Sequence, residues 1–304
     1  MVSFDVVGLF TNVPLDHTIK IILKRIYDDN EIKTDIPRTE MKLLLEMCTK
    51  NVHFTFNDQL YTQIDGVAMG SPLGPVIAGI FMVELETEQV PKMEEIKIWK
   101  RYVDDTFCIT KKGKSESILK TLNKNKHIKF TCEKQSNNML AFLDVLLVNR
   151  FGTLDTTVYR KPTHTDIYIN WNSYAPETWK RGTLKMAVKR AFTICNQKYF
   201  LYAELEYLET VFSEINGYPI QLIKRTINEC RKEQTPQPEP TENEKPEVST
   251  IVLPYAGVQG ELISKDINKT LRKVLDNKIK GRIAFRSKKL KTCFQVKDRT
   301  EKKH

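Results

Sequence analysis

Apolar positions in the first half of the chain switch between the period of a helix and the period of a strand. They recur every three or four residues in four segments, which predicts helices at residues 14–29, 37–50, 72–90 and 115–124. Runs of β-branched and aromatic residues predict strands at residues 2–7, 99–110 (two strands joined by a polar turn), 128–133, 141–148 and 155–160. Residues 53–63 alternate around Asn57-Asp58, which predicts a hairpin. This interleaved order predicts an α+β fold.

Beyond residue 160 the apolar spacing becomes helical. It predicts three helices at residues 175–196, 199–215 and 219–232, with Asn216-Gly217 as the break between the last two. Residues 233–249 contain four Pro, five Glu and no aromatic residue, so an extended linker is expected there. In the tail, a helix is expected at 261–275 and a small hairpin at 281–296. The chain is therefore divided into residues 1–159, 160–232, 233–249 and 250–304.

The formal net charge of +10 is unevenly distributed. Residues 1–100 carry 10 basic and 15 acidic side chains, whereas residues 101–200 carry 18 basic and 8 acidic ones. The tail from residue 250 adds 15 basic and 5 acidic side chains. An acidic first part followed by basic parts favours a cation site followed by surfaces that bind a polyanion. Ordinary solvated charge explains the same distribution about equally well, so the charge alone does not decide.

Pattern and composition exclude several classes of protein. No apolar run approaches the roughly 20 residues that span a bilayer, so no membrane partner is expected. The first residues lack the basic start and apolar stretch of a secretory signal. The six Cys residues are scattered with no Cys-x-x-Cys pair, which favours free thiols in an intracellular protein over disulfides or a zinc site.

Two adjacent carboxylates, Asp104 and Asp105, stand in a predicted turn between apolar strands. Like charges at this spacing repel one another, and a bound divalent cation relieves that repulsion. Mg²⁺ takes oxygen ligands and is commonly held by one or two carboxylates together with substrate phosphates. Taken alone, an Asp-Asp pair is more often an ordinary acidic turn, because Asp favours turns.

Asp5 adds a third carboxylate at the end of the first predicted strand. If that strand lies beside the Asp104-Asp105 hairpin, three carboxylates meet. Such a set suits two metal ions about 3.5–4 Å apart, one activating a nucleophile and one neutralising a leaving group. Taken alone, Asp5 is equally well explained as a cap or turn residue.

Two further segments have residue types that suit contact with a nucleotide. Phe10 lies five residues after Asp5, and a planar ring there can lie beneath a sugar and exclude a 2′-hydroxyl. Residues 66–75 hold three Gly and two Pro, and Gly permits close approach of backbone to a ligand. The alternatives are a core aromatic residue and a plain connection from a loop to a helix.

Together these segments resemble the palm of a reverse transcriptase, and within that superfamily they are most similar to the Penelope-like retroelements. The stretches that carry the resemblance are DVVGLFTNVP at 5–14, MGSPLGP at 69–75, RYVDD at 101–105, FLD at 142–144 and YRKPT at 159–163. Many other reverse transcriptases have Gln where this chain has Met69, whereas the Penelope-like group resembles this chain in having Met. The resemblance runs through most of residues 1–232.

The resemblance implies an RNA-directed DNA polymerase of a retrotransposon. The implied fold is an antiparallel sheet with packed helices, followed by a helical, thumb-like segment at 160–232 that is also similar to a helix-turn-helix. The implied metal and catalytic residues are Asp5, Asp104 and Asp105, which would hold two Mg²⁺ ions, with Mn²⁺ as an alternative. The implied nucleotide-binding residues are Phe10, Met69, Gly70 and Ser71. The implied partners are an RNA template, a DNA primer and deoxynucleotides, and the implied location is the nucleus.

The helical segment is rich in basic residues that suit phosphate contacts. The predicted nucleic-acid-binding residues are Arg160, Lys161, Lys180, Arg181, Lys185, Lys189 and Arg190. Aromatic residues among them (Trp171, Tyr174 and Trp179) suit stacking on bases or sugars. The alternative is thumb-like packing with a solvated basic face, and both can hold together.

Three other polar residues receive weaker assignments. Asp144 is expected to be structural, as an acid after an apolar pair at a strand end. His164 lacks partners at metal-ligand spacing, so a ligand role is not expected. The general acid for pyrophosphate departure stays unassigned, with Lys134 as one candidate among several.

The position of the motifs within the chain leads to one further expectation. Asp5 lies four residues from the start, so the fingers that precede a palm are expected to be absent. Residues 250–304 resemble the connector that leads to a GIY-YIG endonuclease in Penelope-like elements, and no such endonuclease follows. Two functions stay open: a polymerase, or a non-catalytic nucleic-acid-binding remnant of the same element.

Overall fold

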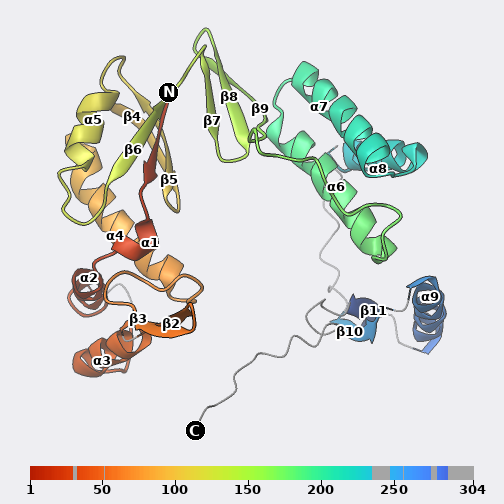
Figure 1. Cartoon of the computed structure of the whole chain (residues 1–304), viewed down its shortest axis with the longest axis horizontal. Helices are drawn as coiled ribbons and strands as arrows, with labels where there is room; N and C mark the ends of the chain where they lie inside the picture. Colours follow the sequence, from red (N-terminus) through yellow and green to blue (C-terminus); the bar gives the residue numbers. More distant parts are fainter. Residues whose placement is uncertain (30–32, 51, 235–246, 256, 275–278, 287–304) are drawn as a thin grey trace. The chain divides into compact units, whose positions relative to one another are not determined.

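The computed structural model describes all residues except 30–32, 51, 235–246, 256, 275–278 and 287–304 (Figure 1). The chain divides into a first unit, Met1–Asp155, and a second unit, Thr156–His304. Each unit contains its own cluster of buried apolar side chains. No described helix is long and apolar enough to cross a membrane.

A four-stranded antiparallel sheet with the order β4-β5-β1-β6 lies at the centre of the first unit. Its strands are β1 (Val2–Val6), β4 (Ile96–Tyr102), β5 (Asp105–Thr110) and β6 (Phe130–Lys134). Along β1, Val2, Phe4 and Val6 are buried and Asp5 is exposed. Because successive side chains of a strand point to opposite faces, this alternation places the apolar residues in the core and the carboxylate outside it.

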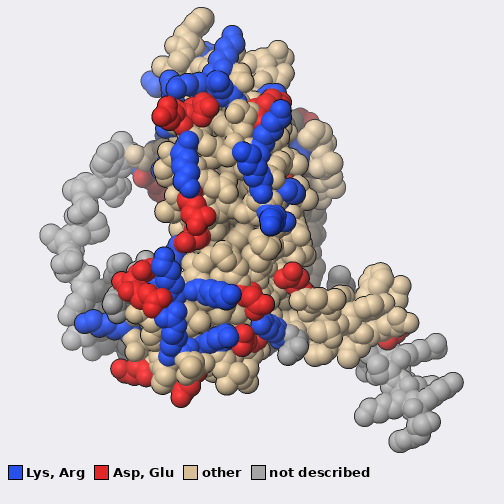
Figure 2. Space-filling model, turned by 90° about the vertical axis from the view of Figure 1, so that its left-hand side faces the viewer, with Lys and Arg blue, Asp and Glu red and all other residues tan. Residues whose placement is uncertain are grey.

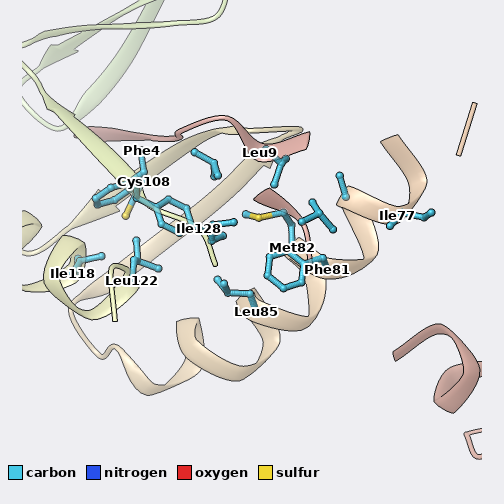
Figure 3. Close-up of a cluster of buried hydrophobic side chains, with 14 of the residues drawn as sticks. Phe4, Leu9, Ile77, Phe81, Met82, Leu85, Cys108, Ile118, Leu122 and Ile128 are labelled. Atoms are coloured by element: carbon cyan, nitrogen blue, oxygen red, sulfur yellow. The ribbon is translucent and has the colours of Figure 1, made fainter. Parts of the chain in front are cut away.

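Two helices, α4 (Gly74–Gln89) and α5 (Ser115–Leu122), complete this core. Figure 3 shows Phe81 and Met82 of α4 in one cluster with Phe4 of β1, and Leu122 of α5 lies in the same cluster. All four side chains are at most 4% exposed. The core therefore fixes β1 against the helix that follows the Gly-rich loop. A 3₁₀ turn, Val90–Lys92, continues from α4 toward β4.

In the described residues, five further elements lie between β1 and α4 in the sequence. They are α1 (Leu9–Asn12), α2 (Leu15–Tyr27), α3 (Arg38–Thr49), β2 (His53–Phe56) and β3 (Gln59–Thr62). The hairpin predicted around Asn57-Asp58 is confirmed, and both turn residues have positive φ, as a type I′ turn requires. α1 was not predicted, because four residues are too few to show a helical period.

A three-stranded sheet with the order β7-β8-β9 follows. Its strands are β7 (Met139–Phe142), β8 (Val145–Arg150) and β9 (Thr153–Val158). The single strand predicted at 141–148 is wrong, because Leu143 has a φ of +53° and reverses the chain together with Asp144. The apolar run across this turn concealed it. Asp144 thus lies in a turn, which agrees with its expected structural role.

Three helices form the body of the second unit, as predicted. They are α6 (Glu177–Ile194), α7 (Lys198–Thr210) and α8 (Ile220–Glu233), and a π-helical turn at Val211–Ile215 extends α7. The predicted break is confirmed, since Gly217 has a φ of +71° and the buried Asn216 side chain donates to the backbone carbonyls of Asp166 and Val211. Leu184, Leu208 and Ile223 bring one side chain from each helix into the core.

The tail contains β10 (Glu247–Pro254), α9 (Gly257–Val274) and β11 (Ile279–Arg286). The two strands pair in parallel, which α9 makes possible by crossing between them. Of the residues expected to form a linker, Glu233 belongs to α8 and residues 247–249 belong to β10, while 235–246 lie outside the described residues. The second half of the hairpin expected at 281–296 lies outside the described residues.

Candidate active site and nucleic-acid interface

The pairing of β1 with β5 brings two predicted catalytic carboxylates together. Asp5 lies directly opposite Asp105 in the strand register. Residues in this relation have their side chains on the same face of the sheet. The preceding pair, Phe4 and Thr106, is fully buried. The Asp5–Asp105 pair therefore points to the face away from the core.

Asp104 lies in the two-residue turn between β4 and β5, and its neighbour Val103 has an unfavourable backbone conformation. The φ of Val103 is +56°, in the left-handed region that β-branched residues rarely occupy. A positive φ at the first turn residue alone is the pattern of a type II′ turn, where Gly is usual. Such a residue costs about 1–3 kcal/mol and persists only where surrounding contacts hold it.

Contacts from two neighbouring elements hold this turn. The Val6 amide donates to the Asp104 carbonyl at 3.3 Å, and Nη1 of Arg101 donates to the Val103 carbonyl at 3.0 Å. Arg101 is fixed in turn by Glu86 of α4, whose Oε1 accepts from the Arg101 Nε at 2.7 Å. The sequence interpretation assigned no role to Glu86. No local spacing shows this contact, because the partners are 15 residues apart on different elements.

The charges of Asp5 and Asp104 lie close enough to affect each other. Partial burial and the negative charge of Asp104 raise the pKa of Asp5 above its usual value, and a hydrogen bond from the Val6 amide partly opposes that shift. Within the described part of the chain, no group of three or more His, Cys, Asp or Glu side chains could hold a metal ion. The structure thus brings the carboxylates together in two pairs, Asp5 with Asp105 and Asp5 with Asp104. One or two carboxylates are the usual protein share of an Mg²⁺ site that also binds substrate phosphates, so these pairs fit that ion.

Phe10 and the Gly-rich loop are packed against each other. Phe10 lies on α1, is half-buried at the edge of the core, and its carbonyl accepts from the Val67 amide at 2.6 Å. A Cβ on Gly66 would lie 2.5 Å from the Thr11 carbonyl carbon and oxygen. A Cβ on Gly74 would lie 3.9 Å from the Phe10 ring. Only Gly66 is therefore required by the close approach, since a Cβ on Gly74 would make ordinary contact with the ring. The loop lies beside the segment that carries Asp5 and Phe10.

The three predicted loop residues differ in their surroundings. Met69 is 74% exposed. Gly70 has a φ of +91°, and no atom of the described residues comes within 4 Å of the position that a Cβ would take there. The Ser71 hydroxyl accepts from the Leu73 amide at 3.3 Å, just before α4 begins. Met69 and Gly70 are therefore open to a ligand, whereas Ser71 also organises the start of the helix.

Two of the predicted nucleic-acid-binding residues have internal partners. Nζ of Lys180 donates to the carbonyls of Trp171 and Ser173, both at 2.7 Å, and the residue is 8% exposed. Arg160 forms a two-pronged ion pair with Glu204, with one arm at 2.8 Å. These contacts explain both residues as parts of the folded second unit.

The remaining predicted basic residues are nearer to solvent, although most have acidic neighbours. Arg181 pairs with Glu177, and both Lys185 and Lys189 pair with Glu233. Arg190 donates weakly to the Tyr159 carbonyl at 3.4 Å, and Lys161 is exposed. Neighbouring acidic side chains therefore balance much of the positive charge expected for this unit.

The aromatic residues of this segment also contribute to packing. The Trp171 ring lies 5.2 Å from that of Tyr218, and the Tyr174 ring lies 5.2 Å from that of Tyr255. Trp179 is 42% exposed. Stacking on a nucleic acid stays a prediction for all three, and Trp179 and Tyr174 have the exposed surface that it needs.

A separate group of basic side chains belongs to the first unit. Residues 111–129 contain seven Lys and a single acid, Glu116. Glu116 pairs with Lys134, the general-acid candidate, at 2.5 Å. Figure 2 shows the face that carries α5, where Lys and Arg side chains lie among Asp and Glu. The basic middle of the sequence is thus divided between two units.

His164 has polar neighbours within the second unit. Its Nε2 lies 3.0 Å from an Asp166 carboxylate oxygen, and its ring contacts the Tyr168 ring. These contacts give His164 a packing and hydrogen-bonding role within the second unit.

Comparisons with known proteins bear on each unit. The model of the family described as "Animal helix-turn-helix domain" matches residues 167–228, which include α6, α7 and most of α8. No curated protein matches the chain. The helix-turn-helix character expected for the second unit is therefore supported, while the match covers too little of the chain to define its family.

Solved structures show the fold. The chain is similar to one in the structure of telomerase from Candida albicans in complex with a fragment of telomeric RNA, with a TM-score of 0.51 and 13% identity. That likeness covers 78% of this chain and 40% of the other. A Sicinivirus 3Dpol RNA-dependent RNA polymerase gives a TM-score of 0.42 at 13% identity, over 75% of this chain and 51% of that one, and this score carries no argument. The first likeness shows that the chain has a polymerase-like fold, whereas the Penelope-like group stays a prediction.

Proposed function

We propose that this chain is the palm and thumb-like part of an RNA-directed DNA polymerase, a reverse transcriptase of the Penelope-like retroelements. The observation that carries the proposal is the register that sets Asp5 opposite Asp105, beside the strained turn that carries Asp104. The polymerase-like fold supports it.

In the proposed reaction, the 3′-hydroxyl oxygen of a DNA primer attacks the α-phosphorus of a deoxynucleotide, and pyrophosphate leaves. Asp5, Asp104 and Asp105 would hold two Mg²⁺ ions, or Mn²⁺ in their place. When bound, these ions supply Lewis-acid stabilisation of the charge on the phosphate oxygens. A bound cation would favour the ionised form of Asp5 and would therefore oppose the shift that raises its pKa.

Phe10, Met69, Gly70 and Ser71 are proposed to line the nucleotide pocket. Support comes from the packing of the Gly-rich loop on the α1 backbone, which ties the two segments together. The Phe10 ring would exclude a 2′-hydroxyl on the incoming sugar. The exposed Met69 and Gly70 would contact the templating base and the nucleotide.

The second unit is proposed to hold the template and primer through phosphate contacts. The exposed members of the predicted set (Lys161, Arg181, Lys185 and Lys189) are the ones we assign to this role, because Arg160 and Lys180 have internal partners. The ion pairs of Arg181 with Glu177, and of Lys185 and Lys189 with Glu233, would exchange for phosphates. Such exchange costs little, since exposed ion pairs contribute about 0–1 kcal/mol.

Primer extension tests the catalytic proposal. The full chain is incubated with an oligo(dT) primer on poly(rA), deoxynucleotide and Mg²⁺, beside the Asp104→Asn variant and the Lys97→Ala variant. Lys97 is exposed on β4 away from the turn, so it serves as a surface control. Incorporation by the parent chain and by Lys97→Ala, and none by Asp104→Asn, supports the proposal. Equal incorporation by Asp104→Asn and the parent chain, including none by either, contradicts it.

A second candidate function is nucleic-acid binding without polymerisation. The observation that favours it is the helix-turn-helix match at residues 167–228. It predicts binding that weakens steeply with salt and is unaffected by Asp5→Ala. Fluorescence anisotropy with a labelled RNA–DNA duplex from about 50 to about 300 mM salt measures this. Binding that persists in a chain shortened to residues 1–159 would count against it.

A further inference from the structure

We propose that Arg101 is the positioning residue of the carboxylate turn, and that Glu86 of α4 fixes Arg101 for this task. The inference rests on the proposed function, since it concerns how that site is held ready for a divalent cation. Arg101 does not itself bind the cation. It acts by fixing the backbone that carries Asp104 and Asp105.

The first step of the argument is that the turn needs an external restraint. Val103 occupies a left-handed conformation that a β-branched residue avoids. Relaxation of that residue would rotate the following peptide and move Asp104 relative to Asp5. The neighbouring Val6–Asp104 hydrogen bond is long, at 3.3 Å, so it offers only a weak restraint.

The second step is that Arg101 supplies this restraint at the strained residue itself. Its Nη1 donates to the Val103 carbonyl at 3.0 Å while its Nε donates to Glu86 at 2.7 Å. The Arg101 and Glu86 side chains are only 13% and 16% exposed, so water competes poorly for the bond between them, whereas the bond to the Val103 carbonyl lies at the surface. One planar guanidinium thus connects a helix carboxylate to the turn carbonyl.

The third step is that Glu86 is itself held in place. Its Oε1 also accepts from the Trp99 indole N–H at 2.8 Å, and the Trp99 ring stacks on the fully buried Phe4 at 5.6 Å. Phe4 directly precedes Asp5 on β1. The network therefore connects α4, β4 and β1, the three elements whose relative positions decide where the carboxylates lie.

The chemistry of the residue explains why arginine is needed. A guanidinium offers several N–H donors in a rigid fork, so it can serve two acceptors in fixed directions. A lysine ammonium has one donor centre on a flexible stem and cannot span Glu86 and the Val103 carbonyl with the same geometry. Arg101→Lys keeps the charge and removes the bridge.

The experiment compares Arg101→Lys and Glu86→Ala with the parent chain, with Glu86→Gln as the conservative variant. The first readout is amide hydrogen exchange of Val6, whose N–H donates to the Asp104 carbonyl. The second is the affinity for Mn²⁺ alone, measured by electron paramagnetic resonance. Asp104→Asn is included to establish that Mn²⁺ binds at the proposed site.

Arg25→Lys is the matched control. Arg25 donates to Glu84 of the same helix at 2.9 Å, and these side chains are 25% and 29% exposed. Like Arg101–Glu86, this pair joins an arginine to a glutamate of α4. Unlike that pair, it does not involve the turn. A general effect of losing an arginine–glutamate pair on α4 would appear in this variant too.

Loss of an outer-shell partner typically lowers metal affinity about 10–100-fold. We expect a decrease of about that size for Arg101→Lys and Glu86→Ala, with Val6 exchange about 10-fold faster or more. Glu86→Gln keeps the acceptor oxygen and is expected to retain Mn²⁺ affinity within about 3-fold of the parent, and Arg25→Lys to match the parent.

The outcomes separate this inference from the proposed function. Mn²⁺ binding that depends on Asp104 but is the same in Arg101→Lys and Arg25→Lys overturns the positioning role alone. Mn²⁺ binding that is absent, or unaffected by Asp104→Asn, overturns the proposed function. In that case the hydrogen exchange of Val6 still tests the positioning role. Exchange that is unchanged in Arg101→Lys overturns it, and exchange that is faster only in Arg101→Lys and Glu86→Ala supports it.

Discussion

Replacing Gly66 by Ala tests whether the Gly-rich loop is held against the segment that follows Asp5. The new Cβ would lie 2.5 Å from the carbonyl carbon and oxygen of Thr11 and 2.6 Å from the Phe10 carbonyl oxygen. All three atoms belong to backbone, so no flexible side chain can move aside. The φ of Gly66 is +75°, which adds a conformational cost to the collision.

The magnitude follows from these two effects. A left-handed conformation costs an L-residue about 1–2 kcal/mol relative to Gly. Forcing an extra carbon into a packed contact typically costs about 1–3 kcal/mol more. Gly66→Ala is therefore expected to destabilise the first unit by about 2–5 kcal/mol. The 2.6 Å hydrogen bond from Val67 to Phe10 is expected to break as the two segments separate.

Gly113→Ala is the matched control, because its φ is +76° and no atom of the described residues lies within 4 Å of its Cβ position. It is expected to cost about 1–2 kcal/mol, the conformational part alone. Urea unfolding followed by hydrogen exchange of β1 peptides measures the first unit separately. Equal losses for the two variants would refute the close approach of the loop to α1.

Three further predictions concern charged groups. Asp104→Asn removes a negative charge that raises the pKa of Asp5, so that pKa is expected to fall toward its usual value in a carboxyl NMR titration. Arg160→Ala leaves the buried Glu204 without its partner and is expected to destabilise the second unit by about 3 kcal/mol in urea unfolding. Hydrogen bonds from two lysines lower the pKa of Glu233 from 4.5 to about 2. Its stabilising contribution is therefore present above pH 4.5 and lost as the pH falls toward about 2, and Glu233→Gln is expected to reduce the acid sensitivity of the second unit in that window.

Each of these has a result that contradicts it. An Asp5 pKa that does not change in Asp104→Asn would mean that the two carboxylates do not sense each other. Lys161→Ala is the control for Arg160→Ala, since an exposed substitution is expected to change stability by about 0.5 kcal/mol or less. Equal losses in these two variants would exclude the buried ion pair. An acid-unfolding profile identical in Glu233→Gln and the parent would exclude the lysine contacts.

The local pattern of apolar residues was sufficient to predict most helices and strands of the chain. The helices with a clear apolar period, such as the one at 219–232, were predicted nearly at their observed bounds, because burial of one face repeats every three to four residues. The strand at 141–148 was wrong, because a continuous apolar run conceals the turn at Leu143-Asp144. The short helix α1 and the parallel pairing of β10 with β11 have no local signature at all.

For the candidate site, too, the sequence indicated some features and the structure alone revealed others. Residue types and order alone indicated Asp5, Asp104 and Asp105 as a set, and the fold brings β1 beside their hairpin. The contact of Glu86 with Arg101 joins residues on different elements, so no spacing along the chain could reveal it. The same holds for Lys180, whose charge suggested phosphate binding and whose buried contacts indicate a packing role.

The sequence by itself determined which residues are apolar, where the chain can turn, and the order of the carboxylates, glycines and aromatic residues, which resembles that of a reverse-transcriptase palm. Only the tertiary structure decided which of these groups are neighbours. The physical reason is that periodicity reports burial within one element. The fixing of Arg101 by Glu86 and the ion pairs of Lys185 and Lys189 with Glu233 depend on contacts between elements distant in the chain.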